Sequence, residues 1–165
     1  MTDTKSNEYL VRRLNSEDTI ERQNARSLLV ERGQEAVPFL LKALKSPRHW
    51  VRWEAAKALA QIGDNSAIDD MVLALADPEF DVRWIAAEGL IAIGPAALPA
   101  VLKELVDEPE SPVVKESVHH VLHDMKMGDL AEMMDPIRLS LEGTGPLEPE
   151  VIAEETLNKL KDLDS

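Results

Sequence analysis

Cysteine is absent from the 165-residue sequence, which excludes a disulfide framework, a thiolate metal site and a cysteine nucleophile. The sequence also lacks a run of about 20 apolar residues, the length that a membrane-spanning helix requires. Its first ten residues contain no apolar core of signal-peptide length. These absences fit a reducing compartment, and we predict a cytoplasmic protein that does not bind membranes.

Aromatic and basic residues are also scarce. Six residues are aromatic, and 18 Lys and Arg stand against 31 Asp and Glu, so the formal net charge is −13. Such a charge opposes binding to nucleic acid or to an anionic membrane surface, and we predict neither partner. The 44% hydrophobic and 30% charged residues fit one globular domain.

The charge is divided unevenly along the chain. Residues 1–57 hold 11 basic and 8 acidic groups, whereas residues 58–165 hold 7 and 23. The acidic C-terminal part is either a solvated surface that maintains solubility or a docking field for a basic partner. We favour the solvated surface.

A ten-residue pattern recurs along the chain. N-A-R-S-L-L-V-E-R-G ends at Gly33, E-A-A-K-A-L-A-Q-I-G at Gly63 and I-A-A-E-G-L-I-A-I-G at Gly94, at spacings of 30 and 31 residues. A fourth, degenerate copy is V-V-K-E-S-V-H-H-V-L. Apolar residues at helical spacing lie between the copies, so each unit is predicted to be two helices, with Gly at the helix ends and Pro47 and Pro78 in first turns. Helix pairs of fixed period stack into a solenoid, and we predict an all-α superhelix.

The segments V-R-W-E-A-A-K-A-L-A-Q-I-G-D and D-P-E-F-D-V-R-W-I-A-A-E-G-L-I-A-I-G resemble short HEAT-like repeats of the phycobilisome-lyase type, about 31 residues long. This resemblance covers residues 16–141 and implies about four helix pairs. We expect residues 1–15 to form an N-terminal cap and residues 142–165 a linker and a C-terminal capping helix, all within one domain. The resemblance implies a protein-binding scaffold more strongly than an enzyme.

Each second helix has one apolar stripe and one unusual stripe. Val51, Ala55 and Leu59, like Val82, Ala86 and Leu90 one copy later, recur at core-facing positions. Four of the six aromatic residues fall on the opposite stripe, which the resemblance places on the concave surface of the superhelix. The predicted protein-binding groove contains Trp50, Trp53, Glu54, Lys57, Phe80, Trp84, Ile85, Glu88, Glu116 and His120.

Two interpretations of the Trp residues remain open. Trp53 and Trp84, one repeat apart, would form one continuous interaction patch if packed helices lie about 8 to 10 Å apart. Alternatively, the rings fold back over the Ala-rich helices and complete the core. We favour the interaction patch, because Gln23 and Glu116 occupy the same position in the flanking copies.

A basic residue recurs at one position of every copy: Arg22, Arg52, Arg83 and Lys115. We interpret this ladder as structural, with partners at repeat boundaries such as Asp77 or Glu108, rather than as a phosphate site.

The fourth copy contains three of the four His residues. His119 and His123 lie one helical turn apart, and Glu116, His120 and Asp124 share the groove stripe. A metal or catalytic constellation is one interpretation, and a solvated or partly buried cluster is the one we favour.

The predicted function is a non-enzymatic scaffold that binds a protein or peptide with basic and apolar character. The sequence lacks the His-Glu dipeptides of HEAT-like hydroxylases, a Gly-rich phosphate loop and a Ser-His-Asp arrangement. We predict no catalytic residue, no cofactor and no metal. The alternatives are a small enzyme, either a tetrapyrrole lyase subunit or a DNA base-excision type, and a self-association module that forms homo-oligomers.

Overall fold

The computed structural model describes residues 6–163, in which every regular element is a helix. Residues 1–5 of the predicted N-terminal cap and residues 164–165 of the predicted C-terminal one lie outside the described residues. The α-helices are α1 (Asn7–Arg13), α2 (Thr19–Glu31), α3 (Val37–Ala43), α4 (His49–Ile62), α5 (Ile68–Leu73), α6 (Phe80–Ile93), α7 (Leu98–Asp107), α8 (Pro112–Asp124), α9 (Ala131–Leu141) and α10 (Pro149–Leu163). The 3₁₀ turns are η1 (Gly33–Ala36), η2 (Asn65–Ala67), η3 (Ala74–Ala76), η4 (Pro95–Ala97) and η5 (Gly128–Leu130).

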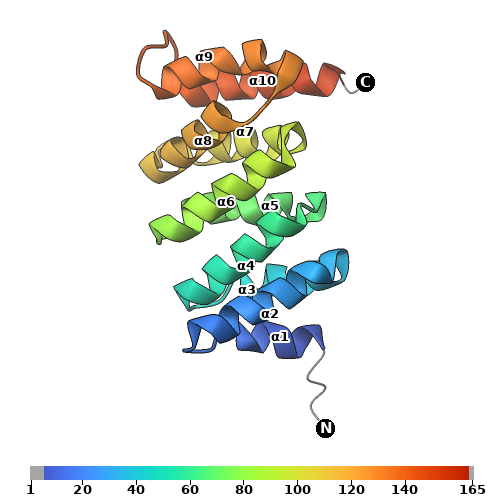
Figure 1. Ribbon diagram of the computed structural model, residues 1–165. Helices are drawn as coiled ribbons and strands as arrows, with labels where there is room; N and C mark the ends of the chain where they lie inside the picture. Colours follow the sequence, from blue (N-terminus) through green and yellow to red (C-terminus); the bar gives the residue numbers. More distant parts are fainter. Residues whose placement is uncertain (1–5, 164–165) are drawn as a thin grey trace.

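The helices stack in two rows (Figure 1). Helices α2, α4, α6 and α8 pack in succession in one row, with the most extensive contact between α4 and α6. Helices α1 and α3, and then α5 and α7, pack against each other in the other row. This arrangement confirms the predicted all-α solenoid.

The core lies between the two rows and follows the predicted stripes. Val51, Ala55 and Leu59 of α4 are buried, as are their counterparts in α6. Gly89 of α6 lies close against α4 and α5: a Cβ atom added there would lie 2.9 Å from the Cβ of Ala60 and closer still to the side chain of Met71. Glycine therefore lets these helices pack more closely than any larger residue would.

The helix ends confirm the predicted left-handed glycine cap at Gly63 and correct the proline prediction. Gly94 ends α6 with φ 85° and ψ −153°, outside the left-handed helical region, and the cap of α2 is Arg32, one residue before Gly33. Gly63 closes α4 in the left-handed conformation, with φ 67° and ψ 28°, which costs a residue with a Cβ more than it costs glycine. Pro47 and Pro78 do not lie in the first turn, because α4 and α6 begin two residues after them. Their carbonyl groups instead accept hydrogen bonds from the arginine ladder.

The ladder is structural, as predicted. In each of its three arginines, Nη1 donates to the carbonyl oxygen six residues earlier, over 2.8 to 2.9 Å; the pairs are Arg22 to Ser16, Arg52 to Ser46 and Arg83 to Asp77. Each guanidinium group thereby fixes the turn that precedes its own helix.

The ladder's ion pairs match the prediction in part. Arg52 also binds the Asp77 carboxylate through two hydrogen bonds of 2.7 and 2.9 Å, which raise the pKa of Arg52 against the opposing effect of burial. Lys115 pairs with Glu150 of α10 instead, with 3.6 Å between Nζ and Oε2. Glu108 forms no ion pair within residues 6–163, so that predicted partner was wrong.

Helices α9 and α10 close the C-terminal end of the stack (Figure 1). Helix α9 packs against α8, and α10 packs against both α9 and α7, so α10 covers the end of the row that contains α7. No single helix within residues 6–163 has the length and apolar character to cross a membrane. Only α6 taken together with Pro95–Asp107 reaches that length and composition, and these two segments are bent by 116°.

Candidate functional site

The predicted binding residues lie on α4, α6 and α8, in the row of helices that begins with α2, and we call the surface of this row the even-helix face. Together with neighbouring side chains, all of them except Trp50 and Ile85 form two clusters. The Trp53 cluster, between α2 and α4, contains Arg22, Arg26, Trp53, Glu54 and Lys57. The Trp84 cluster, between α6 and α8, contains Phe80, Trp84, Glu88, Glu116, His120 and Asp124.

Two cations cover the indole of Trp53. The guanidinium carbon of Arg26 lies 5.6 Å from the ring centroid, and the ammonium nitrogen of Lys57 lies 5.1 Å from it. The ring is half-buried between them. Cation–π contacts of this kind hold the side chain in place and leave less of it for a partner.

Glu54 is not the exposed groove acid that we predicted. Glu54 is only 3% exposed. Its Oε2 lies 2.5 Å from Nη1 of Arg26, and its Oε1 lies 3.5 Å from Nε of Arg22. Both arginines come from α2, the neighbouring helix, so this ion-paired group ties α2 to α4. A buried carboxylate with two cationic neighbours is a packing element rather than a docking group.

Trp50 and Ile85 also contribute to packing more than the prediction allowed. Both are half-buried and lie against the hydrophobic core. The ring centroid of Trp50 lies 5.2 Å from the guanidinium carbon of Arg48 and 5.3 Å from the ring centroid of His49. The buried indole N–H of Trp50 has no hydrogen-bond partner within the described residues. Trp50 stands in the first turn of α4.

The Trp84 cluster is open to solvent. Phe80 is 58% and Trp84 is 48% exposed, with ring centroids 6.0 Å apart. Trp84 also stacks on the imidazole of His120, with ring centroids 4.2 Å apart and an interplanar angle of 30°. A hollow of about 60 Å³ lies beside these rings, bordered also by Arg83, Ala87, Glu116 and Ser117.

The rings of Trp53 and Trp84 do not contact each other, so they do not form the continuous patch that we predicted. Among residues 6–163, the aromatic contacts of Trp84 go to Phe80 and His120, and Trp53 contacts Arg26 and Lys57. The two rings stand in equivalent positions of consecutive repeats, but different neighbours surround them.

His120 lies between two carboxylates. Its Nε2 is 3.1 Å from Oε1 of Glu88 on α6 and 3.3 Å from Oδ2 of Asp124 on its own helix. The other oxygen of Asp124 contacts Nδ1 of His123 at 2.7 Å. The hydrogen bond with His123, aided by the charge of both histidines, lowers the pKa of Asp124.

The predicted histidine cluster is therefore divided. The Nε2 atom of His119 lies 3.3 Å from Glu142 at the end of α9, away from the two carboxylates of His120. The sequence indicated His120 and Asp124 through their spacing of one turn on α8. Glu88 joins them across the packed helices, and no spacing along the chain could have shown that contact.

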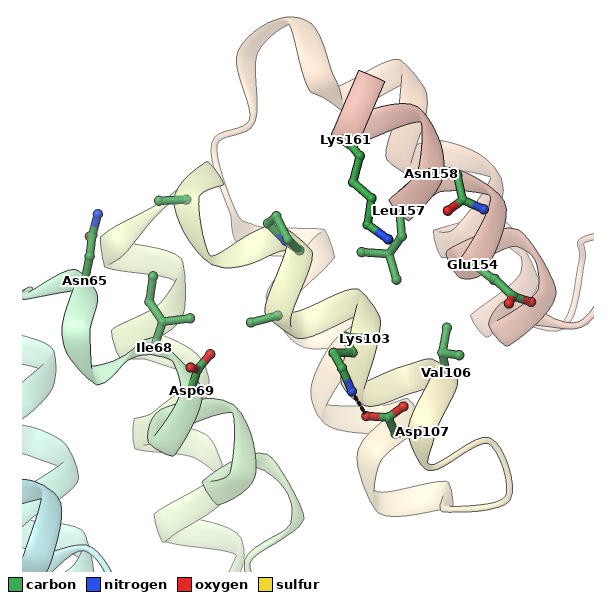
Figure 2. Close-up of a pocket in the computed structure, with 13 residues that line it drawn as sticks. Asn65, Ile68, Asp69, Lys103, Val106, Asp107, Glu154, Leu157, Asn158 and Lys161 are labelled. Atoms are coloured by element: carbon green, nitrogen blue, oxygen red, sulfur yellow. Dashed lines mark hydrogen bonds and ion pairs between the residues drawn. The ribbon is translucent and has the colours of Figure 1, made fainter. Parts of the chain in front are cut away.

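A hollow that the sequence did not predict lies on the opposite side of the molecule. This cavity has a volume of about 620 Å³. Figure 2 shows side chains of α7 and α10 approaching one another beside those of η2 and α5. Its lining mixes apolar residues such as Ile68 and Leu157 with an ion pair between Lys103 and Asp107. It contains no histidine among the described residues, and the docking of α10 creates it.

Comparison with models of protein families matches residues 7–91 to HEAT repeats. The matched segment runs from α1 to near the end of α6, so it contains both Trp53 and Trp84. A search among curated proteins found no match.

Proposed function

The chain belongs to the HEAT repeat family, and on this premise we propose that it is a non-enzymatic scaffold whose Trp84 cluster binds a protein or peptide with basic and apolar character. HEAT repeats form helical scaffolds that generally mediate protein interactions. The family match extends to the repeat and not to the phycobilisome-lyase subtype.

The exposed pair of Phe80 and Trp84 is the observation that carries the proposal. Large aromatic side chains contribute strongly to protein interfaces when a partner covers them, and here two adjacent rings are about half exposed. The adjacent hollow offers room for one small apolar group of the partner. Trp84 is also held by the ring of His120, so it loses little side-chain entropy on binding.

The charge around the rings supports the basic character of the partner. Asp81, Glu88, Glu116 and Asp124 are exposed acids of α6 and α8, in the part of the chain that holds 23 acidic and 7 basic residues. A Lys or Arg side chain next to the contact would pair with these acids and approach the face of Trp84.

The test compares a double variant, Phe80→Ala with Trp84→Ala, with wild type and with Leu73→Ala. Leu73 is 61% exposed on α5, in the other row, and is the matched control for loss of an exposed apolar side chain. A partner captured from the cells that express the protein is purified, and its affinity for all three is measured by calorimetry. We expect the double variant to bind at least about tenfold more weakly and Leu73→Ala to bind like wild type.

Two outcomes would overturn this proposal. One is unchanged partner affinity in the double variant while both variants remain folded by circular dichroism. The other is a wild-type protein that forms a dimer by light scattering and becomes monomeric in the double variant, which would assign the Trp84 cluster to self-association. Glu88→Gln with Glu116→Gln serves as an electrostatic check, because it should slow association at low salt.

A further inference from the structure

Three ligand atoms converge where α6 meets α8. Nε2 of His120, Oε1 of Glu88 and Oδ2 of Asp124 all lie within 4.8 Å of one another. The two distances from Nε2 are 3.1 Å to Glu88 and 3.3 Å to Asp124. These groups come from two helices, so their convergence is a property of the packed solenoid rather than of one amphipathic surface.

The two separations from Nε2 of His120 are close to those between neighbouring ligands of a tetrahedral zinc site. Zinc binds imidazole nitrogen and carboxylate oxygen at about 2.0 to 2.2 Å, and tetrahedral angles then place neighbouring ligand atoms about 3.3 to 3.6 Å apart. The measured distances from Nε2 lie within a few tenths of an ångström of that range. We propose that Glu88, His120 and Asp124 bind one Zn²⁺ ion, with water in the fourth position.

The donor set selects the class of metal. One imidazole with two carboxylates suits Zn²⁺, whereas Mg²⁺ and Ca²⁺ prefer sites built from oxygen alone. Two carboxylates also balance the charge of a divalent ion. In a chain with a net charge of −13, a cation relieves the mutual repulsion of these acids.

Neighbouring side chains orient two of the three ligands. Asp124 directs one oxygen to Nδ1 of His123 at 2.7 Å, which leaves the other oxygen facing His120. The stacked ring of Trp84 fixes the plane of the His120 imidazole. Nε2 of His120 is itself buried and already lies close to both carboxylates, so all three donor atoms face one point. Supporting contacts of this kind strengthen metal sites.

The competing interpretation is a protonated imidazole that pairs with the two carboxylates without a metal. Zinc titration separates the two, because the metal must displace that proton and needs all three ligands. The full-length chain is stripped with a chelator, and its zinc affinity is measured by competition with a chromophoric chelator. Cobalt substitution provides a second readout, since tetrahedral Co²⁺ absorbs strongly in the visible range.

We expect one zinc ion per chain and a loss of affinity of at least about tenfold in each of Glu88→Gln, His120→Gln and Asp124→Asn. His119→Gln and Glu116→Gln are the matched controls on the same helix and should bind zinc like wild type. Glu88 and Asp124 are exposed, so their variants report on binding even if the partly buried His120 proves necessary for stability.

Several results would overturn the site: no saturable binding of one zinc ion per chain, an affinity unchanged in the three ligand variants, or tighter binding of Mg²⁺ or Ca²⁺ than of Zn²⁺. The zinc site does not rest on the proposed partner. Zinc affinity is measured on the chain alone, so either proposal can fail while the other stands.

Discussion

Trp53 and Trp84 occupy the same position in consecutive repeats, 31 residues apart, yet they have different surroundings. Trp53 is half-buried between Arg26 and Lys57, next to the buried carboxylate of Glu54. Trp84 is 48% exposed and stacks on His120. The repeat therefore determines the position of a side chain on its helix, and the neighbouring helix determines how far that side chain is buried and what it contacts.

The difference follows from what each flanking helix supplies. Helix α2 presents two arginines to α4, and they neutralise Glu54 and cover Trp53. Helix α8 presents Glu116, His120 and Asp124 to α6, and the ion-pair partners of Glu88 and Asp124 within the described residues are histidines rather than arginine or lysine. The uneven charge along the chain thus becomes a difference between two ends of one face: the Trp53 cluster is internally paired, and the Trp84 cluster is open to a cation.

The largest expected effect concerns one glutamate from each cluster, Glu54 beside Trp53 and Glu88 one helical turn after Trp84. Glu54→Gln should lower the free energy of unfolding by about 3 kcal/mol, because it leaves two largely buried arginines without their counter-charge. Glu88→Gln, on an exposed side chain of α6, should change it by about 0.5 kcal/mol or less. Urea unfolding followed by circular dichroism measures both. Equal losses in the two variants would contradict the division of the face into paired and open clusters.

The next effect separates the two Trp residues themselves. Trp53→Ala should cost about 2 kcal/mol, since it removes a half-buried ring and two cation–π contacts. Trp84→Ala should cost about 0.5 kcal/mol, because much of that ring already faces water. Chemical unfolding of the single variants tests the contrast. Should Trp84→Ala prove the more destabilising of the two, Trp84 would be a packing residue, and the proposed interaction surface would lose its support.

The smallest expected effect on stability depends on pH and concerns Glu104, in the acidic C-terminal part of the chain. Burial, together with Glu108 and Asp107, raises the pKa of Glu104 in α7 above its ordinary value of 4.5. The ionised carboxylate therefore opposes folding at neutral pH, and this penalty disappears as the pH falls through the raised pKa toward 4.5. Because the group is partly solvated, Glu104→Gln should stabilise the protein at pH 7 by less than about 1 kcal/mol.

Thermal unfolding of wild type and Glu104→Gln at pH 7 and pH 4 checks the sign. The advantage of the variant should be present at pH 7 and absent at pH 4. A variant that is less stable than wild type at pH 7 would show that the carboxylate makes a favourable contact when ionised. Glu116→Gln, at an exposed acid of α8, is the control for the removal of one surface negative charge at pH 7.

Much of the fold could be predicted because it depends on local periodicity. The recurrence of Val51, Ala55 and Leu59 at helical spacing identified the buried side of α4, and the burial of all three confirmed it. The recurring arginines were correctly assigned a structural role. The errors concerned contacts between helices: Glu54 pairs with α2, and Lys115 pairs with Glu150 of α10 rather than at a repeat boundary.

The candidate site illustrates the same limit. A period of 3.6 residues identified the stripe that contains Trp84, Glu88 and His120, but it carries no information on which helix lies opposite or at what distance. The stacking of Trp84 on His120 and the approach of Glu88 to the same imidazole join residues more than 30 positions apart. Only the packing of α6 against α8 brings them together.

Repeat period, apolar stripes and turn glycines were sufficient to specify an all-helical stack and the side of each helix that faces its core. These features follow from backbone geometry and from the burial of apolar surface, both of which act over a few residues. The tertiary structure decided which polar and aromatic side chains are covered, paired or exposed. That outcome depends on the charges and ring contacts that neighbouring helices contribute, and these contributions differ from one repeat to the next.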